Sequence, residues 1–470
     1  MIEPKNRLKR LINIYLGLFV LLSLFAVVYT VFTNYAAHEK ILNKSLIATL
    51  SFAIVTAALF FLDAKKRANA ALMHFSILFS LFLINLLFEI PLDQGNIERA
   101  AKRTGIKWDK RNKYEVVDAL RKKDITAFPT AFFPAFVGEE GFFTEKFGLK
   151  LDNLFPLSGV ANVETVLSNE TGEWIIYKSD RYGFNNDDSV YEKSGRPILI
   201  VGDSFAQGIS VPQKDSVAGN LLHRGYKAIS LGTGGSGPLI ELAAIKEYGP
   251  YLKPKIILWF YYEGNNYLHL PKEYRYPALN KYLEKGYSQH LINRQPEIDQ
   301  FWADFFAKAE KYLKNEKESV VFWRKASSKK LLKGLILRMV TLHNIRKIAG
   351  VSRHSYLFEG VDRSGFDTTE PMFRNVMKIA KEEAEGLGAK LYFVYLPNYA
   401  SFFNQKILLS PSSQTVRKII AELDIPVIDF YKCLKDTGDP NEFFPFRLGG
   451  HYSVKGYNLL ANLIEEEALK

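Results

Sequence analysis

The sequence contains almost no cysteine. Cys433 is the only one in 470 residues. A disulfide scaffold needs paired cysteines, and cysteine-based zinc or iron–sulfur sites need clusters of them, so the sequence excludes these classes. Extended disorder is also excluded, because 47% of the residues are hydrophobic and disordered chains lack that apolar content.

Acidic residues are outnumbered by basic ones, 50 Asp and Glu against 62 Lys and Arg, which gives a net charge of +12. The N-terminal region departs most from this composition, because it contains three apolar runs at 11–32, 41–62 and 70–90. About 20 apolar residues in a helix span a bilayer. We therefore predict that residues 1–91 form a membrane anchor of three transmembrane helices. A cleaved signal peptide is the alternative for the first run, but two more runs follow it.

Basic residues flank these runs unevenly and predict their orientation. Seven lie before the first run or between the second and third, and two lie between the first and second. The seven are Lys5, Arg7, Lys9, Arg10, Lys65, Lys66 and Arg67, and the two are Lys40 and Lys44. The positive-inside bias then places the N-terminus in the cytoplasm and the chain beyond residue 90 on the outer side. Anchoring is favoured over transport, because the runs carry few polar groups.

The remainder divides at about residue 195. Residues 92–195 hold a charged, helix-like stretch at 107–123 and are expected to be a lead-in segment that packs on the next domain. From residue 196, short continuous apolar runs alternate with helical patterns. The five runs are 197–201, 226–231, 255–262, 391–396 and 426–430. This alternation predicts an α/β fold with a parallel sheet that is covered on both faces.

A long insertion at about 268–365 interrupts the alternation. Its part at 311–350 is rich in Lys and Arg with apolar residues interleaved. One interpretation is a solvated helical face over the core. The other is a surface that rests on anionic lipid or polysaccharide. Nucleic acid is not expected as a partner, because the predicted topology places the segment outside the cytoplasm.

Two polar loops follow the first two apolar runs, at the edge where open α/β sheets place their sites. Gly202-Asp203-Ser204 follows the first, and Ser204 suits either a nucleophile at a strand-to-helix turn or a simple helix cap. A glycine-rich stretch, 232–238, follows the second and also reads as G-x-G-x-x-G. Dinucleotide binding is disfavoured there, because Pro238 removes a donor where the helix would begin. The other use of this loop is a backbone N–H that points into a site.

Two further loops carry an amide and an imidazole. Asn265 follows the third apolar run, where its side chain suits an oxyanion donor or a turn. His451 lies in a glycine-flanked loop before the last helical pattern, and there it suits a general base or a structural role.

The four motifs in this order resemble the SGNH (GDSL-type) hydrolase superfamily, over about residues 196–470 with the insertion set aside. Residues 177–186 are also similar to the lead-in of membrane-anchored bacterial members. The resemblance implies a three-layer α/β/α, flavodoxin-like parallel sheet. It further implies that Ser204 is the nucleophile, that His451 is the base, and that Ser204, Gly235 and Asn265 form the oxyanion hole.

The sequence departs from the family pattern at the triad acid. The family has an aspartate three residues before its histidine, and this chain has Leu448 there. Asp439, Glu442 and Asp429 are carboxylates nearby in sequence that would orient the imidazole instead. A Ser–His dyad and loss of activity are further alternatives. Glu263 and Asn266 also replace the family's glycine and aspartate around Asn265.

The function implied by the resemblance is that of a membrane-anchored serine esterase that needs no cofactor or metal. The predicted location is the bacterial inner membrane with a periplasmic catalytic domain, so the expected substrates are acyl esters of envelope or lipid-linked glycans. The alternatives are an O-acyltransferase on the same scaffold and a catalytically inactive glycan-binding or assembly module.

Overall fold

The computed structural model describes residues 10–21, 24, 28, 50–51, 54–55, 57–89, 100–131, 151, 153–264, 266–315, 364–402 and 411–470. The chain forms two compact units. The first comprises Met1–Asp93 with Val320–Val361, and the second comprises Gln94–Ser319 with Asp362–Lys470.

The helices of the first unit differ from the predicted membrane anchor. Its described residues include helical residues 10–21, the 3-10 helix η1 (Leu59–Phe61) and helix α3 (Ala64–Glu89). Helix α3 starts six residues before the predicted third span and takes Lys65, Lys66 and Arg67 into its first turn. A spanning helix needs about 20 consecutive apolar residues. Among the described residues, no helix meets that requirement in both length and apolarity, so the prediction of three transmembrane helices is wrong for this part of the chain.

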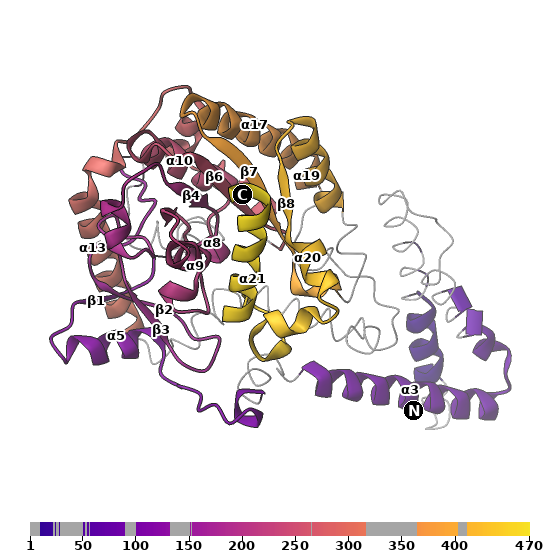
Figure 1. Ribbon diagram of the computed structural model, residues 1–470. Coiled ribbons are helices and arrows are strands. Elements are labelled where there is room, and N and C mark those ends of the chain that lie inside the picture. The colour runs from indigo at the N-terminus through magenta and orange to yellow at the C-terminus, as the bar shows by residue number, and fades with distance from the viewer. Residues whose placement is uncertain are drawn as a thin grey trace. The chain divides into compact units, whose positions relative to one another are not determined.

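The second unit is built on a parallel five-stranded sheet with the strand order β5-β4-β6-β7-β8 (Figure 1). All four strand pairs are parallel. The strands are β4 (Ile198–Val201), β5 (Ala228–Ser230), β6 (Ile256–Tyr262), β7 (Lys390–Leu396) and β8 (Val427–Asp429). Counted along the chain, this order is 2-1-3-4-5, the flavodoxin-like order, and its switch point lies between β4 and β6. The α/β part of the predicted fold therefore agrees with the structure.

Alternate side chains of each strand enter two different cores. On β4, Leu199 and Val201 join one buried cluster, whereas Ile198 and Ile200 join the other. Helices α10 (Pro238–Leu252), α17 (Ser364–Gly386) and α19 (Pro411–Glu422) contribute to the first cluster. Helices α8 (Ser204–Gln207), α9 (Val217–His223), α20 (Phe430–Asp436) and α21 (Val454–Ile464) contribute to the second. Because both faces are apolar and covered, the strands read as continuous apolar runs.

The lead-in segment forms a small sheet of its own, β1-β2-β3. Strand β1 (Ala127–Pro129) pairs in parallel with β2 (Glu164–Ser168), and β2 pairs antiparallel with β3 (Ile175–Lys178). Helix α5 (Lys113–Arg121) packs on it through Val116 and Val117. A capping box formed by Asn112 and Glu115 marks the start of α5. The helix therefore begins at Lys113, later than the helix-like stretch predicted at 107–123.

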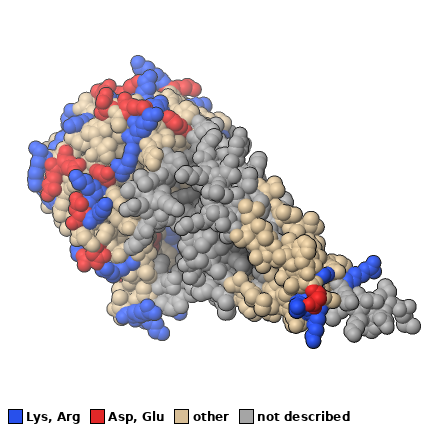
Figure 2. Space-filling model, turned by 90° about the vertical axis from the view of Figure 1, so that its right-hand side faces the viewer, with Lys and Arg blue, Asp and Glu red and all other residues tan. Residues whose placement is uncertain are grey.

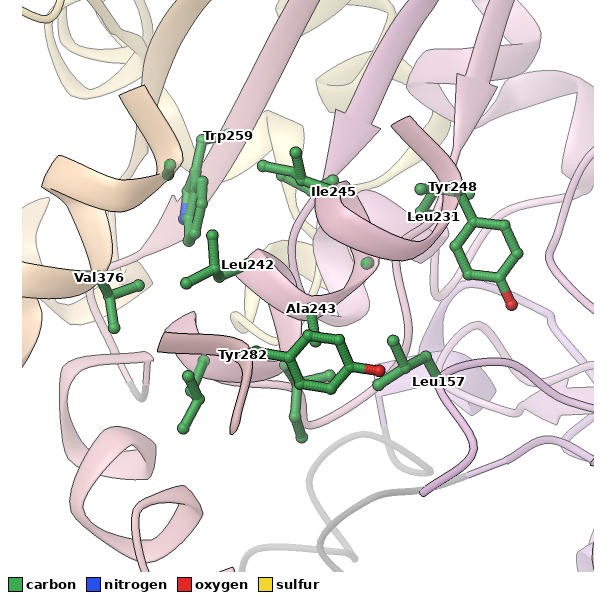
Figure 3. Close-up of a cluster of buried hydrophobic side chains, with 14 of the residues drawn as sticks. Leu157, Leu231, Leu242, Ala243, Ile245, Tyr248, Trp259, Tyr282 and Val376 are labelled. Carbon is green, nitrogen blue, oxygen red and sulfur yellow. The ribbon is translucent and has the colours of Figure 1, made fainter. Parts of the chain in front are cut away.

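The lead-in segment shares the first core with the large sheet. Figure 3 shows Leu157 of this segment beside α10 side chains such as Ala243, with Trp259 of β6 and Val376 of α17 in the same cluster. The lead-in segment and the sheet thus bury a common apolar surface.

The insertion is described as far as residue 315. It contains α11 (Asn266–Glu273), α12 (Pro277–Asn280) and α13 (Gln295–Asn315). Residues 316–363, which hold most of the predicted basic surface, lie outside the described residues. On the face shown in Figure 2, Lys and Arg side chains are interspersed with Asp and Glu over the described surface of the α/β unit.

Candidate active site

Ser204 lies where β4 turns into α8. The turn needs Gly202, whose φ is 151° and where an added Cβ would lie 2.7 Å from Phe260 Cβ. Asp203 caps α8 by accepting a hydrogen bond from the N–H of Phe205, at 3.0 Å. Ser204 is therefore the first residue of a helix at the carboxyl edge of the sheet, and it is buried. This is the position that the sequence predicts for it.

His451 approaches Ser204 from the loop before α21. Its Nε2 lies 2.7 Å from Ser204 Oγ, although the two residues are 247 positions apart. Gly449 and Gly450 precede it with φ values of 92° each, a conformation that side chains other than glycine rarely adopt. The predicted nucleophile and base are thus within hydrogen-bonding distance.

A carboxylate that the sequence analysis did not identify completes the arrangement. Glu170 Oε1 lies 2.8 Å and Oε2 lies 3.0 Å from His451 Nδ1, and the N–H of His451 donates to Oε2 at 3.2 Å. Glu170 lies just after β2, in the connection to β3. Because a carboxylate accepts, Nδ1 carries the proton, and Nε2 is left to accept from the Ser204 hydroxyl. The result is a Ser–His–Glu chain of hydrogen bonds.

Glu170 is itself held in place. Ser210 Oγ donates to Glu170 Oε2 at 2.5 Å, and Ser210 is buried with a left-handed φ of 75°. An added Cβ on Gly450 would lie 3.1 Å from the same oxygen, so glycine is needed there for space as well as for conformation. Such contacts fix the carboxylate against the imidazole.

Glu170 and His451 each shift the pKa of the other. Burial lowers the pKa of His451, but the charge and hydrogen bond of Glu170, together with the charge of Asp203, outweigh burial and raise that pKa above its usual value. Burial raises the pKa of Glu170, but His451 and the Ser210 hydroxyl outweigh it and lower that pKa to about 2. Glu170 is therefore ionised at neutral pH, where it stabilises an imidazolium.

The carboxylates expected to orient the imidazole have other partners. Asp439 pairs with Arg447 at 2.5 Å, and Glu442 pairs with Lys455. Asp429 caps α20 and pairs with Arg417 at 2.8 Å. The structure does not bring these three to His451. They lie close to it in sequence, but their side chains are used locally.

Of the three residues predicted to form the oxyanion hole, Ser204 and Gly235 are among the described residues and Asn265 is not. Among the described residues, neither the N–H of Ser204 nor that of Gly235 donates a hydrogen bond to a protein acceptor. Gly235 has a φ of 79° in the loop after β5. Asn265 lies outside the described residues, but its neighbour Asn266 is buried, accepts from the N–H of Tyr262 at 3.2 Å and donates to Glu241 at 2.7 Å.

The glycine-rich loop does not leave a helix N-terminus open for a phosphate. Glu273 accepts from the N–H groups of Gly237 and Leu239, at 2.6 and 2.9 Å, at the start of α10. A pyrophosphate would need those donors. In the described part of the chain, no three His, Cys, Asp or Glu side chains are arranged to bind a metal ion together.

Glu170 was missed for a physical reason. The polar stretch 168–172, between two short β-like runs, could have indicated a hairpin turn. That signal does not say which site the turn reaches, and Glu170 is 281 residues from His451.

Comparison with known proteins gives little beyond this geometry. No family model matches the chain, and no curated protein matches it. A search of solved structures finds similarity to the lipase/acylhydrolase from Enterococcus faecalis. That match has a TM-score of 0.30 and 15% sequence identity, and it covers 58% of this chain and 95% of the other.

Proposed function

We propose that the chain is a serine ester hydrolase in which Ser204, His451 and Glu170 form the catalytic triad. The observation that carries the proposal is the continuous hydrogen bonding from Ser204 Oγ to His451 at 2.7 Å and from His451 to Glu170 at 2.8 Å. Nucleophile, base and orienting acid within such distances are what acyl transfer through a serine requires. The substrate class is an acyl ester.

In this mechanism the Ser204 oxygen attacks the ester carbonyl carbon while His451 Nε2 takes the hydroxyl proton. The oxyanion would receive hydrogen bonds from the N–H groups of Ser204 and Gly235 and from the Asn265 side chain. The tetrahedral intermediate then expels the alcohol, which takes the proton from Nε2. Water attacks the acyl-serine by the same route, releasing the carboxylic acid and restoring Ser204.

Glu170 bears on the alternative of an inactive binding module. That alternative rested on Leu448, which replaces the family's aspartate. Here a carboxylate from the lead-in segment contacts Nδ1 instead. The geometry therefore favours an active triad over a dyad or an inactive site.

The test is covalent labelling of the full chain with a fluorophosphonate probe, together with hydrolysis of p-nitrophenyl acetate. We expect labelling on Ser204 alone, and loss of labelling and hydrolysis in Ser204→Ala and His451→Ala. Ser189→Ala is the matched control, because that serine lies in the 3-10 helix η3 (Asp188–Glu192), outside the triad. Unlabelled protein, or full hydrolysis by His451→Ala, would refute the proposal.

A further inference from the structure

The two backbone donors predicted for the oxyanion hole belong to different elements. Ser204 begins α8, whereas Gly235 lies in the loop that joins β5 to α10. An oxyanion hole works only if its donors are held at a fixed spacing before the reaction, because preorganisation is what stabilises the developing charge. Some contact must therefore tie the loop to α8.

Backbone packing supplies part of that tie. Gly232 lies so close to α8 that an added Cβ would be 2.4 Å from the backbone nitrogen of Gln207. Ser230 Oγ donates to the carbonyl of Ala206 at 2.7 Å and accepts from the N–H of Gly232 at 3.1 Å. These contacts fix the start of the loop, but they stop short of Gly235.

The Gln207 side chain continues the tie to the tip of the loop. Its Oε1 accepts from the N–H of Gly234 at 2.9 Å, and Gln207 is buried. Gly234 and Gly235 are adjacent, and among the described residues the Gly234 N–H has an acceptor whereas the Gly235 N–H has none. Gln207 thus occupies the Gly234 donor and fixes the orientation of the Thr233–Gly234 peptide, one peptide before the one that carries the Gly235 N–H.

The lead-in segment fixes Gln207 in turn. Gln207 Nε2 donates to Thr130 Oγ1 at 3.1 Å, just after β1. Asn185 Nδ2 donates to the carbonyl of Gln207 at 2.7 Å. Because one end of the amide faces an N–H and the other faces a hydroxyl, only one amide orientation satisfies both. The lead-in segment therefore reaches the triad through Glu170 and the oxyanion loop through Thr130.

We infer that Gln207 is a positioning residue of the oxyanion hole, held by Thr130, that directs the Gly235 N–H toward the substrate oxygen. This inference rests on the proposed esterase function. Without an acceptor, the Gly234 N–H would be buried and unpaired, a state that costs enough for the loop to rearrange. Rearrangement would turn the Gly235 donor away while leaving the Ser204–His451–Glu170 contacts in place.

The experiment compares Gln207→Met with Gln207→Glu in the full chain. Methionine keeps the length but has no comparable acceptor, whereas glutamate keeps an oxygen for the Gly234 N–H. We expect Gln207→Met to lower kcat about 10- to 100-fold with KM within about threefold, less than the ~10²–10³-fold cost of removing a donor outright. The acid limb of its pH profile should stay in place, because the triad is untouched. Gln207→Glu should recover most of the loss.

A second pair of measurements separates positioning from folding. Gln213→Met is the matched control, because Gln213 Nε2 donates to the carbonyl of Lys178 at an exposed site, and it should keep wild-type kcat. Thr130→Val, which removes the hydroxyl that holds Gln207, should give a smaller loss of kcat than Gln207→Met. Amide hydrogen exchange of the 232–237 loop should accelerate in Gln207→Met and not in the control.

The outcomes distinguish this inference from the proposed function. An active wild type with kcat unchanged in a folded Gln207→Met would overturn the inference and leave the esterase proposal standing. Equal losses in Gln207→Met and Gln207→Glu, with the pH profile shifted, would also overturn it. If the wild type itself is inactive, the esterase proposal fails, and unchanged loop exchange in Gln207→Met would then refute the positioning role independently.

Discussion

At the scale of single residues, the contact of Glu170 with His451 predicts the effect of replacing Glu170. Glu170→Gln removes the charge that stabilises the imidazolium and replaces one carboxylate oxygen with a donor. We expect kcat/KM to fall about 10²–10⁴-fold, the upper figure being the loss from the corresponding change in a serine-protease triad. Steady-state hydrolysis of p-nitrophenyl acetate measures this loss. Asp439→Asn and Glu442→Gln are the controls, since both carboxylates pair with surface cations, and each should stay within about twofold of wild type.

The same variant should change the pH dependence in a defined direction. His451 acts as a base only when neutral, and the charge of Glu170 opposes the effect of burial and raises the pKa of His451. Removing that charge lowers the pKa, so the acid limb of kcat/KM should move to lower pH in Glu170→Gln. A profile that stays in place, measured on the residual activity after excluding contamination with wild type, would show that Glu170 does not act on His451.

At the scale of elements, much of the fold is predictable from the sequence, whereas the contact of Glu170 with His451 is not. The continuous run at 255–262 became β6 (Ile256–Tyr262), because a strand buried on both faces needs apolar residues at every position. The loops after such strands meet at one edge, which placed Ser204 in the candidate site. Strands β1 to β3 are short and half-buried, so their pattern is weak. The contact of Glu170 with His451 is tertiary, and no local pattern encodes it.

Hydropathy alone does not predict the helices of the N-terminal region correctly. A count of apolar residues gives the composition of a run but not where a helix begins and ends. In the structure, α3 takes in Lys65, Lys66 and Arg67, although these residues lie between the second and third apolar runs, where a connection between two spans is predicted. The apolar signal was real, but the inference from it to three spans went further than the described helices support.

The start of α10 carries a prediction about stability and pH. Burial raises the pKa of Glu273 to about 8, against the lowering effect of the N–H groups of Leu239 and Gly237. The folded state therefore holds a proton that the unfolded state releases near pH 4.5, so the contribution of Glu273 to stability is present at low pH and is lost as pH rises toward 8.

Glu273→Gln tests that dependence, because glutamine does not titrate. The free energy of unfolding of wild type, measured by urea denaturation, should fall more steeply between pH 5 and 8 than that of the variant. Glu297→Gln is the control. Glu297 is exposed and pairs with Arg294, which lowers the pKa of Glu297, so this carboxyl does not titrate between pH 5 and 8. Its curve should run parallel to wild type over that range. Parallel curves for wild type and Glu273→Gln would contradict the prediction.

At the scale of the whole molecule, the proposed catalytic site combines residues of the lead-in segment and of the large sheet, and helix α13 is one element that joins the two. Helix α13 clamps residues 158–161, since Trp302 donates to the carbonyl of Ser158 at 2.6 Å and Asp299 accepts from the N–H of Ala161 at 2.9 Å. Trp302 is fully buried in the core that also contains the β6 side chains. Since the segment held this way supplies Glu170, loss of this packing should remove the proposed triad acid from His451 together with the fold.

Trp302→Phe measures this coupling. It leaves the Ser158 carbonyl without its donor and opens space in the core, so we expect a loss of about 1–3 kcal/mol in the free energy of unfolding. Specific activity without denaturant should stay close to wild type, because the triad contacts remain. In urea, activity and the circular dichroism signal should fall at one common, lowered midpoint. Trp174→Phe, which removes an exposed donor to the Arg111 carbonyl, should shift that midpoint little. If activity is lost well before the dichroism signal, the lead-in segment undocks on its own and the shared core does not couple it to the sheet.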